Sequence, residues 1–256
     1  MMRVVKIGGR AQADPCIADA LCQAWNDSPN GLCVVHGGGD EISAMQRALG
    51  KEASFVGGRR VTSRGDLELL RMVLSGAVNK RLVNVLVAAG VPAVGLSGED
   101  DALIGAEVID AVSLGFAGRP TVIKVQLLRT LLNAGYMPVI SPVAYDATSG
   151  KGGTLNVNGD DAAAAIAAAL EADELLLIAD VEGVRGARGD LVPVLSLESA
   201  RELIASGVAT GGMAAKLESA HAALVAGVDR VRICDLAGLV DSERGTFITQ
   251  SQGVVS

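Results

Sequence analysis

Short apolar runs alternate along the chain with longer segments whose apolar residues recur three and four positions apart. Runs of the first kind predict buried strands, and segments of the second kind predict amphipathic helices. The predicted strands are 3–7, 32–36, 91–96, 137–140, 175–179 and 228–234. The predicted helices begin near Asp14-Pro15 and cover 41–49, 66–89 and 125–133. Another runs from after Asp160-Asp161 to about Ala172, and the last follows Gly212. Strands separated by helices imply an α/β fold, a three-layer α/β/α sandwich around a mainly parallel central sheet.

Two stretches depart from this alternation. The segment 103–123 is β-branched and glycine-rich, which favours a hairpin over a helix. The segment 147–153, Ala-Thr-Ser-Gly-Lys-Gly-Gly, is the softest stretch near the middle of the chain. We expect it to separate two lobes of a single domain, about 1–150 and 151–256, rather than two independent domains.

Composition excludes several classes of protein. The formal net charge of -7 gives no electrostatic reason to expect nucleic acid or an anionic membrane as a partner. The apolar run 162–170 is far shorter than the roughly 20 residues of a membrane-spanning helix, and Lys6 comes too early for a signal peptide. Four cysteines without CxxC spacing and two distant histidines predict free thiols, mostly buried, and no metal site. We therefore expect a soluble, cytoplasmic protein.

Glycine-rich segments follow several predicted strands, at the edge where parallel sheets bind their ligands. Neither G-x-x-x-x-G-K-[ST] nor G-x-G-x-x-G is present, so the two familiar nucleotide loops are excluded. Lys6-Ile7-Gly8-Gly9 instead ends the first strand, and His36-Gly37-Gly38-Gly39 ends the second and opens a helix. Bare amides at a positive helix end can hold an anion. Ordinary turns are the alternative for both loops, and for His36 we expect a packed strand-end histidine rather than a catalyst.

Two further segments bring charged residues to helix starts. Asn156-Val157-Asn158-Gly159-Asp160-Asp161 precedes an alanine-rich helix, and Gly211-Gly212 opens a helix that carries Lys216 about one turn later. Either aspartate can serve as a simple helix cap, and Lys216 alone is compatible with a solvated surface lysine. Taken together, two lysines, two glycine cradles and an aspartate at strand ends suit a polyanionic substrate.

The chain resembles the amino acid kinase family in the order of these segments and over nearly its whole length, from Lys6 to about Ile248. The other segments that carry the resemblance are Gly58-Arg59-Arg60-Val61-Thr62, Asn79-Lys80, Val94-Gly95-Leu96-Ser97-Gly98, Ala179-Asp180-Val181-x-Gly183-Val184 and Gly212-Met213-x-x-Lys216. Gly159 stands where the family usually has alanine, which removes no functional group. The resemblance implies a carbamate kinase-like fold and phosphoryl transfer from ATP.

Within the family, the chain is most similar to the branch whose acceptor is the side-chain carboxylate of N-acetyl-L-glutamate, in the second step of arginine biosynthesis. The resemblance implies that Lys6 and Lys216 stabilise the transferring phosphoryl group and that Asp160 holds both ammonium groups. For acceptor binding it implies Gly38, Gly39, Arg60 and Asn156, with Arg59 as an alternative one position from Arg60. For nucleotide binding it implies Gly8, Gly9, Asp180, Gly183, Val184, Thr210, Gly212 and Met213. Mg²⁺ would be bound largely through the ATP phosphates, without a dedicated protein ligand.

Other functions stay open. A kinase for N-acetyl-aminoadipate, or for aminoadipate on an acidic carrier protein in lysine biosynthesis, differs by about one methylene in its acceptor. The acidic net charge weakly disfavours such a carrier. A non-catalytic nucleotide-binding regulator of this fold is expected to lose a catalytic lysine or the aspartate, and this chain keeps all three. Family members inhibited by arginine form hexamers through an extra amino-terminal helix; the first strand here begins at about Arg3, so we expect a homodimer insensitive to arginine.

Overall fold

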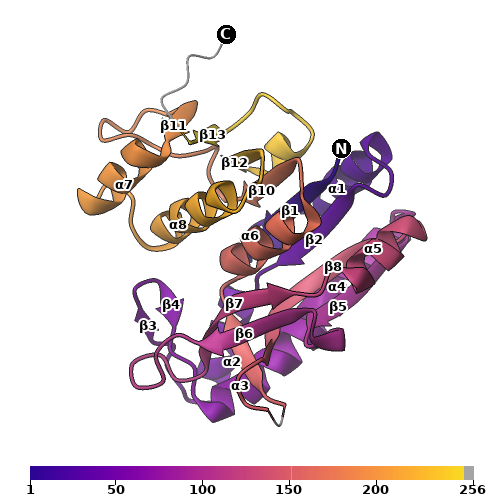
Figure 1. Cartoon of the computed structure of the whole chain (residues 1–256), viewed down its shortest axis with the longest axis vertical. Helices are drawn as coiled ribbons and strands as arrows, with labels where there is room; N and C mark the ends of the chain where they lie inside the picture. Colours follow the sequence, from indigo (N-terminus) through magenta and orange to yellow (C-terminus); the bar gives the residue numbers. More distant parts are fainter. Residues whose placement is uncertain (151, 251–256) are drawn as a thin grey trace.

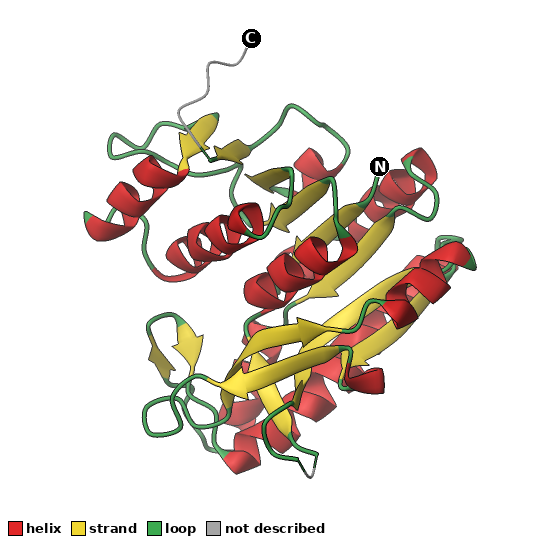
Figure 2. Cartoon of the chain, in the orientation of Figure 1, coloured by secondary structure: helices red, strands yellow, loops and turns green. Residues whose placement is uncertain are grey.

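A mainly parallel sheet forms the centre of the molecule, with helices on both of its faces (Figure 1, Figure 2). The structure is a computed structural model that describes residues 1–150 and 152–250. The strands of the main sheet are β1 (Arg3–Ile7), β2 (Leu32–His36), β5 (Ala93–Gly98), β6 (Ile104–Val108), β7 (Ala117–Ile123), β8 (Met137–Asp146), β9 (Thr154–Val157), β10 (Glu174–Ile178), β11 (Val194–Ser196), β12 (Arg230–Cys234) and β13 (Thr246–Thr249). A separate hairpin pairs β3 (Phe55–Val56) with β4 (Arg59–Arg60). The α-helices are α1 (Ile17–Asp27), α2 (Gly39–Ala48), α3 (Arg64–Leu70), α4 (Asn79–Ala88), α5 (Gln126–Asn133), α6 (Gly159–Leu170), α7 (Leu197–Ala205) and α8 (Gly211–Val225).

The strand order confirms the predicted α/β class. It runs β11-β13-β12-β10-β1-β2-β8-β6-β7-β9, with β5 paired to β8 off this path. The central strands β12, β10, β1, β2 and β8 are parallel, and β13 is antiparallel to β12. The hairpin predicted within 103–123 is the antiparallel pair β6–β7.

Five short strands were not predicted from the pattern. They have two to four residues each, too few to show an alternation, and are β3, β4, β9, β11 and β13. Residue 151, inside the predicted boundary segment 147–153, lies outside the described residues, as do 251–256.

Successive side chains of β1 point to opposite faces of the sheet, and this alternation places its lysine. Val5 and Ile7 pack with α1 and α4, whereas Val4 packs under α6 and α8. Lys6 shares the face of Val4 and therefore points toward the beginning of α6.

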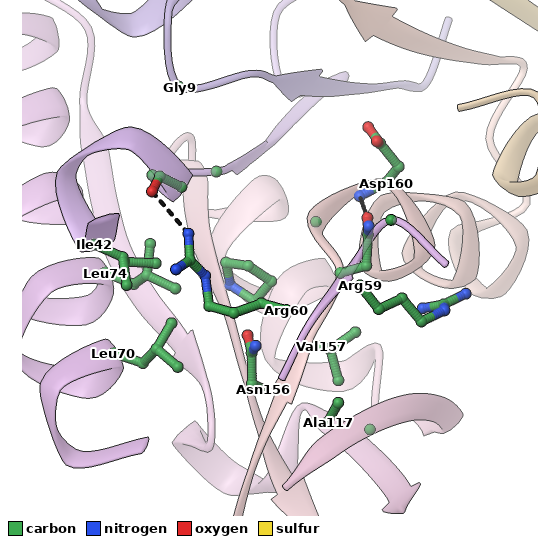
Figure 3. A pocket seen from close by; sticks show the side chains of 18 of the residues that line it. Gly9, Ile42, Arg59, Arg60, Leu70, Leu74, Ala117, Asn156, Val157 and Asp160 are labelled. Carbon is green, nitrogen blue, oxygen red and sulfur yellow. Dashed lines mark hydrogen bonds between the residues drawn. The ribbon is translucent and has the colours of Figure 1, made fainter. Parts of the chain in front are cut away.

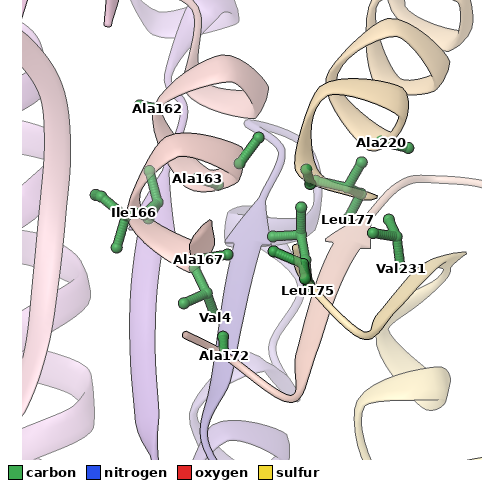
Figure 4. Packing of buried hydrophobic residues seen from close by; sticks show 14 of the residues in the cluster. Val4, Ala162, Ala163, Ile166, Ala167, Ala172, Leu175, Leu177, Ala220 and Val231 are labelled. Atoms are coloured by element: carbon green, nitrogen blue, oxygen red, sulfur yellow. The ribbon is translucent and has the colours of Figure 1, made fainter. Parts of the chain in front are cut away.

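Alanine side chains bring α6 close to the sheet. Ala162, Ala163 and Ala167 are fully buried, and Figure 4 shows them against β1 and β10 on one side and α8 on the other. Small side chains permit a close helix–sheet approach without the cavities that larger, ill-fitting ones leave. The first turn of α6 is thereby fixed at the carboxyl edge of the parallel strands.

The helix predicted over 66–89 is longer and less regular than the pattern indicates. It consists of α3, a π-helix over Arg71–Val78, and α4. Its start was predicted too late, because Ser63 caps α3 in a capping box with Asp66. The wider turn of a π-helix rotates the apolar stripe. As a result, Leu70 and Leu74 face Ile42 and the site described below, while the residues of α4 face α1.

Two smaller expectations need correction. The helix predicted to start at Pro15 begins at Ile17, and Asp14 instead accepts a hydrogen bond from the Cys16 amide. Free thiols are observed as predicted, but Cys16 is exposed and Cys22 half-buried, whereas Cys33 and Cys234 are buried. Burial raises the pKa of Cys234 to about 12 and raises that of Cys33 as well, so both are neutral thiols. Within the described ranges, no helix is long and apolar enough to span a bilayer.

Candidate active site

Two lysines meet one aspartate where β1, α6 and α8 converge. Lys6 Nζ lies 2.8 Å from Asp160 Oδ1, and Lys216 Nζ lies 3.2 Å from each Asp160 carboxylate oxygen. The three side chains are only 6–12% exposed. Asn158, and not Asp160, caps α6 by accepting a hydrogen bond from the Asp160 amide. The Asp160 carboxylate is therefore free to pair with both lysines, and Lys216 is not a solvated surface lysine.

The electrostatics of this cluster favour an anionic ligand. Burial by itself raises the pKa of Asp160, but the two ammonium groups and their hydrogen bonds lower it below its ordinary value, so the carboxylate is ionised. Burial, and then the neighbouring Lys6, lower the pKa of Lys216 to about 8 against the opposing effect of Asp160. Two ammonium groups and one carboxylate leave one net positive charge in a place with little water. The attraction between this positive charge and a bound polyanion is stronger here than it would be in water.

A cavity of about 200 Å³ opens beside Lys6 and Asp160 (Figure 3). The glycine loop between β2 and α2 forms one wall, and β9 and the β3–β4 hairpin form others. All four predicted acceptor-binding residues line the cavity, namely Gly38, Gly39, Arg60 and Asn156. Sequence analysis did not identify its apolar wall of Ile42, Leu70 and Leu74, because their spacing is that of ordinary core positions.

Position 38 has no room for a side chain, because the helical segment that carries Leu74 lies directly behind it. A Cβ atom built there would lie 2.6 Å from Leu74 Cδ2, in the π-helical segment. The backbone N–H groups that follow, at the first turn of α2, have no acceptor within that helix. The loop can therefore present amide hydrogens and the positive end of α2 to an anion, as its sequence predicted.

The two adjacent arginines of the hairpin have different partners. Arg60 is buried, donates to Gln46 Oε1 at 2.6 Å, to the Gly39 carbonyl at 2.9 Å and to Ser43 Oγ at 2.9 Å, and has no carboxylate partner among the described residues. Arg59 is ion-paired with Asp161. Figure 3 shows Arg60 beside Ile42 and Leu74, and Arg59 on the opposite side, toward α6.

Arg60 therefore faces the cavity without an ion pair among the described residues, whereas Asp161 neutralises the charge of Arg59. Burial lowers the pKa of Arg60, with Asp66 and Asp40 opposing, but a guanidinium stays protonated in proteins. Of the two arginines, Arg60 is the one without an ion pair among the described residues, and Asp66 and Asp40 act on it only from a greater distance.

A second cavity, of about 490 Å³, lies on the other side of the lysine pair. Lys216 lines it, and Gly9 and Gly39 line both cavities. Besides Gly9, four of the predicted nucleotide-binding residues line it, namely Gly8, Asp180, Gly212 and Met213. Arg10 donates to Asp180 at 2.6 Å, and this hydrogen bond is the main reason why the pKa of Asp180 is lowered. The two cavities therefore adjoin at Gly9 and Gly39, and each is lined by one of the two lysines that contact Asp160.

Three predicted nucleotide-binding residues line neither cavity: Gly183, Val184 and Thr210. A Cβ atom at Gly183 would lie 2.6 Å from Thr246 Oγ1, and the buried Val184 donates its amide to the same hydroxyl at 2.8 Å. Thr210 precedes α8 and accepts a hydrogen bond from the Met213 amide. A role for these three in nucleotide binding stays a prediction.

His36 is the packed strand-end histidine that was expected. It is fully buried on the face of β2 that packs against α4, with Nδ1 2.8 Å from the Gly37 carbonyl and Nε2 3.1 Å from Asn79 Nδ2. The Gly37 carbonyl can only accept a hydrogen bond and the Asn79 NH2 group can only donate one. Both contacts are therefore satisfied only when Nδ1 carries the proton and Nε2 accepts. Burial is the main reason why the pKa of His36 is lowered to about 4, and nearby cations lower it further.

This neutral histidine predicts a pH-dependent stability. The unfolded chain binds the His36 proton below pH 6.5 and the folded chain only below about pH 4, so the free energy of unfolding falls as pH drops across this interval. The loss attributable to His36 is roughly 3 kcal/mol and is complete near pH 4. Urea unfolding of wild type and His36→Asn between pH 4 and 7 measures it, because carboxylates contribute alike to both proteins. Parallel pH profiles for the two would contradict a buried neutral imidazole.

Among residues 1–150 and 152–250, no three His, Cys, Asp or Glu side chains gather as a metal-binding group.

Comparison with known proteins bears on what these cavities hold. The model of the amino acid kinase family matches residues 1–235. An acetylglutamate kinase of Cereibacter sphaeroides is 46% identical over 238 residues, which cover 91% of this chain and 79% of that protein. An acetylglutamate kinase of Chloroflexus aurantiacus is 43% identical and covers 97% of both chains. A crystal structure from Streptococcus mutans matches with a TM-score of 0.87 and 31% identity, over 98% of this chain and 99% of the other.

Proposed function

Because the chain belongs to the amino acid kinase family, we propose that it acts as an acetylglutamate kinase in arginine biosynthesis. It transfers the γ-phosphoryl group of ATP to the side-chain carboxylate of N-acetyl-L-glutamate. The observation that carries this proposal is Arg60, a buried guanidinium without a carboxylate partner that faces a small cavity next to the Lys6–Asp160–Lys216 cluster. That cavity suits an acceptor with one carboxylate for the arginine and another for the reaction.

The reaction needs no general base, because a carboxylate with a pKa near 4.3 is already ionised at neutral pH. One carboxylate oxygen attacks the γ-phosphorus in line, and the bond from phosphorus to the β,γ-bridging oxygen breaks. The electron pair of that bond leaves with ADP, and the product is an acyl phosphate. The obstacle is repulsion between two anions, so catalysis consists of positioning and charge neutralisation.

The proposed roles follow from which cavity each group lines. Lys6 lines the acceptor cavity and Lys216 the nucleotide cavity, so their ammonium groups flank the group in transfer. Asp160 contacts both and acts as a positioning residue that fixes their separation. The Gly38 and Gly39 amides donate to the anion between the cavities, and Asn156 contacts the acceptor from β9.

Mg²⁺ would be bound largely through the ATP phosphates and water, and would neutralise part of their charge. The acceptor cavity is lined largely by residues before 150, and α8 contributes to the nucleotide cavity. Residues before 150 also line the nucleotide cavity, among them Gly8, Gly9 and Arg10. An acceptor lobe of about 1–150 and a nucleotide lobe of about 151–256, with Gly183, Val184 and Thr210 near the adenosine, stay predictions. A homodimer, a cytoplasmic location and insensitivity to arginine stay predictions; light scattering and assays with millimolar arginine test the first and third.

Trapping of the acyl phosphate with hydroxylamine tests the function. We expect ATP-dependent hydroxamate with N-acetyl-L-glutamate and little with N-acetyl-aminoadipate, glutamate or aspartate. Faster turnover of N-acetyl-aminoadipate would assign the chain to lysine biosynthesis instead. ATP binding without hydroxamate from any acceptor would indicate a non-catalytic regulator.

Arg60→Ala is expected to raise the KM for N-acetyl-L-glutamate by roughly 10- to 100-fold with little change in kcat, because it removes a charged group that binds the acceptor without acting on the transferring phosphoryl group. Steady-state kinetics at saturating ATP measure both constants. Arg119→Ala, which removes an exposed arginine paired with Glu107, is the control and should change neither. An unchanged acceptor KM in Arg60→Ala would show that the arginine does not bind the acceptor.

A further inference from the structure

The β3–β4 hairpin depends on outside contacts for its position. Its two-residue turn has Gly57 and Gly58 at φ of 55° and 74°, the left-handed conformation typical of a tight hairpin. Phe55 and Val56 on its first strand are exposed. A two-stranded ribbon of this kind is marginally stable by itself. Where the hairpin lies, and therefore where Arg60 lies, is set by the elements that it contacts.

Its base and its tip are attached to different parts of the molecule. At the base, Thr62 exchanges backbone hydrogen bonds of 3.0 and 2.8 Å with Leu114 and Phe116, in the loop before β7. At the tip, Arg59 Nη1 pairs with Asp161 Oδ2 in the first turn of α6. A Cβ atom at Gly58 would lie 3.6 Å from the carbonyl oxygen at the first residue of α8.

The Asp161 carboxylate also reaches α8. Its Oδ1 atom accepts a hydrogen bond of 2.7 Å from Ser219 Oγ, and Ser219 is 1% exposed. Ser219 lies three residues after Lys216, so the two side chains share one face of α8. Asp161 also follows Asp160 directly along the chain. One carboxylate therefore touches the hairpin through one oxygen and the lysine-bearing helix through the other.

We propose that Arg59, Asp161 and Ser219 are positioning residues that couple the acceptor site to the nucleotide site. This inference rests on the proposed function. A nucleotide in the cavity that Lys216 lines stabilises α8 where it packs on α6, and Ser219 on the same face of α8 holds Asp161 in the orientation that receives Arg59. The docked hairpin then holds Arg60 at the acceptor cavity, and the acceptor binds more tightly. Linkage makes the effect reciprocal, so the acceptor strengthens nucleotide binding by the same factor.

Calorimetric titration with N-acetyl-L-glutamate, with and without the Mg²⁺ complex of the non-hydrolysable ATP analogue AMP-PNP, tests this coupling. In the wild type we expect the nucleotide analogue to lower the acceptor Kd by about fivefold or more. Arg59→Met and Ser219→Ala should each bring that ratio close to one, and Arg59→Lys should restore part of it. The double variant should show no further loss, because both changes break one relay.

Arg71→Met is the matched control, since it removes a partly exposed arginine paired with Glu99 elsewhere in the molecule and should keep the wild-type ratio. Thermal unfolding verifies that each variant is folded, and Ser219→Ala keeps the test open if Arg59→Met does not fold. A wild-type ratio of one, or variants that keep the wild-type ratio, would overturn the coupling and leave the proposed function intact. No binding of N-acetyl-L-glutamate to the wild type under either condition would overturn the proposed function and this inference with it.

Discussion

Lys216→Met is expected to lower kcat by about 10²–10³-fold while the protein stays folded. The substitution keeps the length of the side chain and removes the ammonium group that lies 3.2 Å from both Asp160 oxygens and lines the nucleotide cavity. That charge opposes the repulsion between the phosphates and the incoming carboxylate, and the repulsion is greatest in the transition state. A coupled assay of ADP release at saturating substrates measures the loss, and circular dichroism verifies the fold.

Lys124→Met is the control, because Lys124 is an exposed lysine that lines neither cavity. The kcat of this variant should equal that of the wild type. Lys216→Arg keeps the positive charge but changes its geometry, and should fall between wild type and Lys216→Met. A Lys216→Met variant with nearly normal turnover would show that Lys216 does not act on the transferring group.

Asp160→Asn is expected to lower the free energy of unfolding by roughly 3–5 kcal/mol and to reduce kcat strongly. The change is nearly isosteric, but it leaves the ammonium groups of Lys6 and Lys216 together in a buried place without their shared counter-ion. Urea unfolding near pH 7 measures the stability, and the ADP-release assay measures the rate.

The double variant Lys6→Met/Asp160→Asn separates these two effects. It restores the original net charge of the cluster, so part of the lost stability should return, while the rate should stay low because two parts of the site are missing. Asp160→Asn with wild-type stability would contradict the conclusion that the carboxylate balances two buried charges.

The residues nearest the strand ends were predictable because local pattern determines them. Lys6-Ile7-Gly8-Gly9 and His36-Gly37-Gly38-Gly39 were recognisable as glycine-rich strand ends, and the structure places Lys6, Gly38 and Gly39 at one cavity. The helical spacing of 66–89 predicted a helix but not its π-helical segment, because the same apolar residues satisfy both periods until tertiary packing selects one.

Contacts between distant parts of the chain could not be predicted from local pattern. Nothing in the sequence shows that Asn158, rather than Asp160, caps α6. Nor does it show which of two adjacent arginines has a carboxylate partner, because Arg59 and Asp161 are 102 positions apart. Nor does the sequence show that Gly183 lies against Thr246, 63 positions away and outside both cavities.

In the proposed mechanism, two ammonium groups held by one carboxylate flank the phosphoryl group as it passes between nucleotide and acceptor. A crystal structure of the enzyme with ADP, aluminium fluoride, Mg²⁺ and N-acetyl-L-glutamate tests it most directly. We predict that Lys6 Nζ and Lys216 Nζ both lie within hydrogen-bond distance of the fluoride group or its bridging oxygen, with Asp160 still bonded to both. Either lysine turned away from that group, or Asp160 bound to neither, would contradict the account.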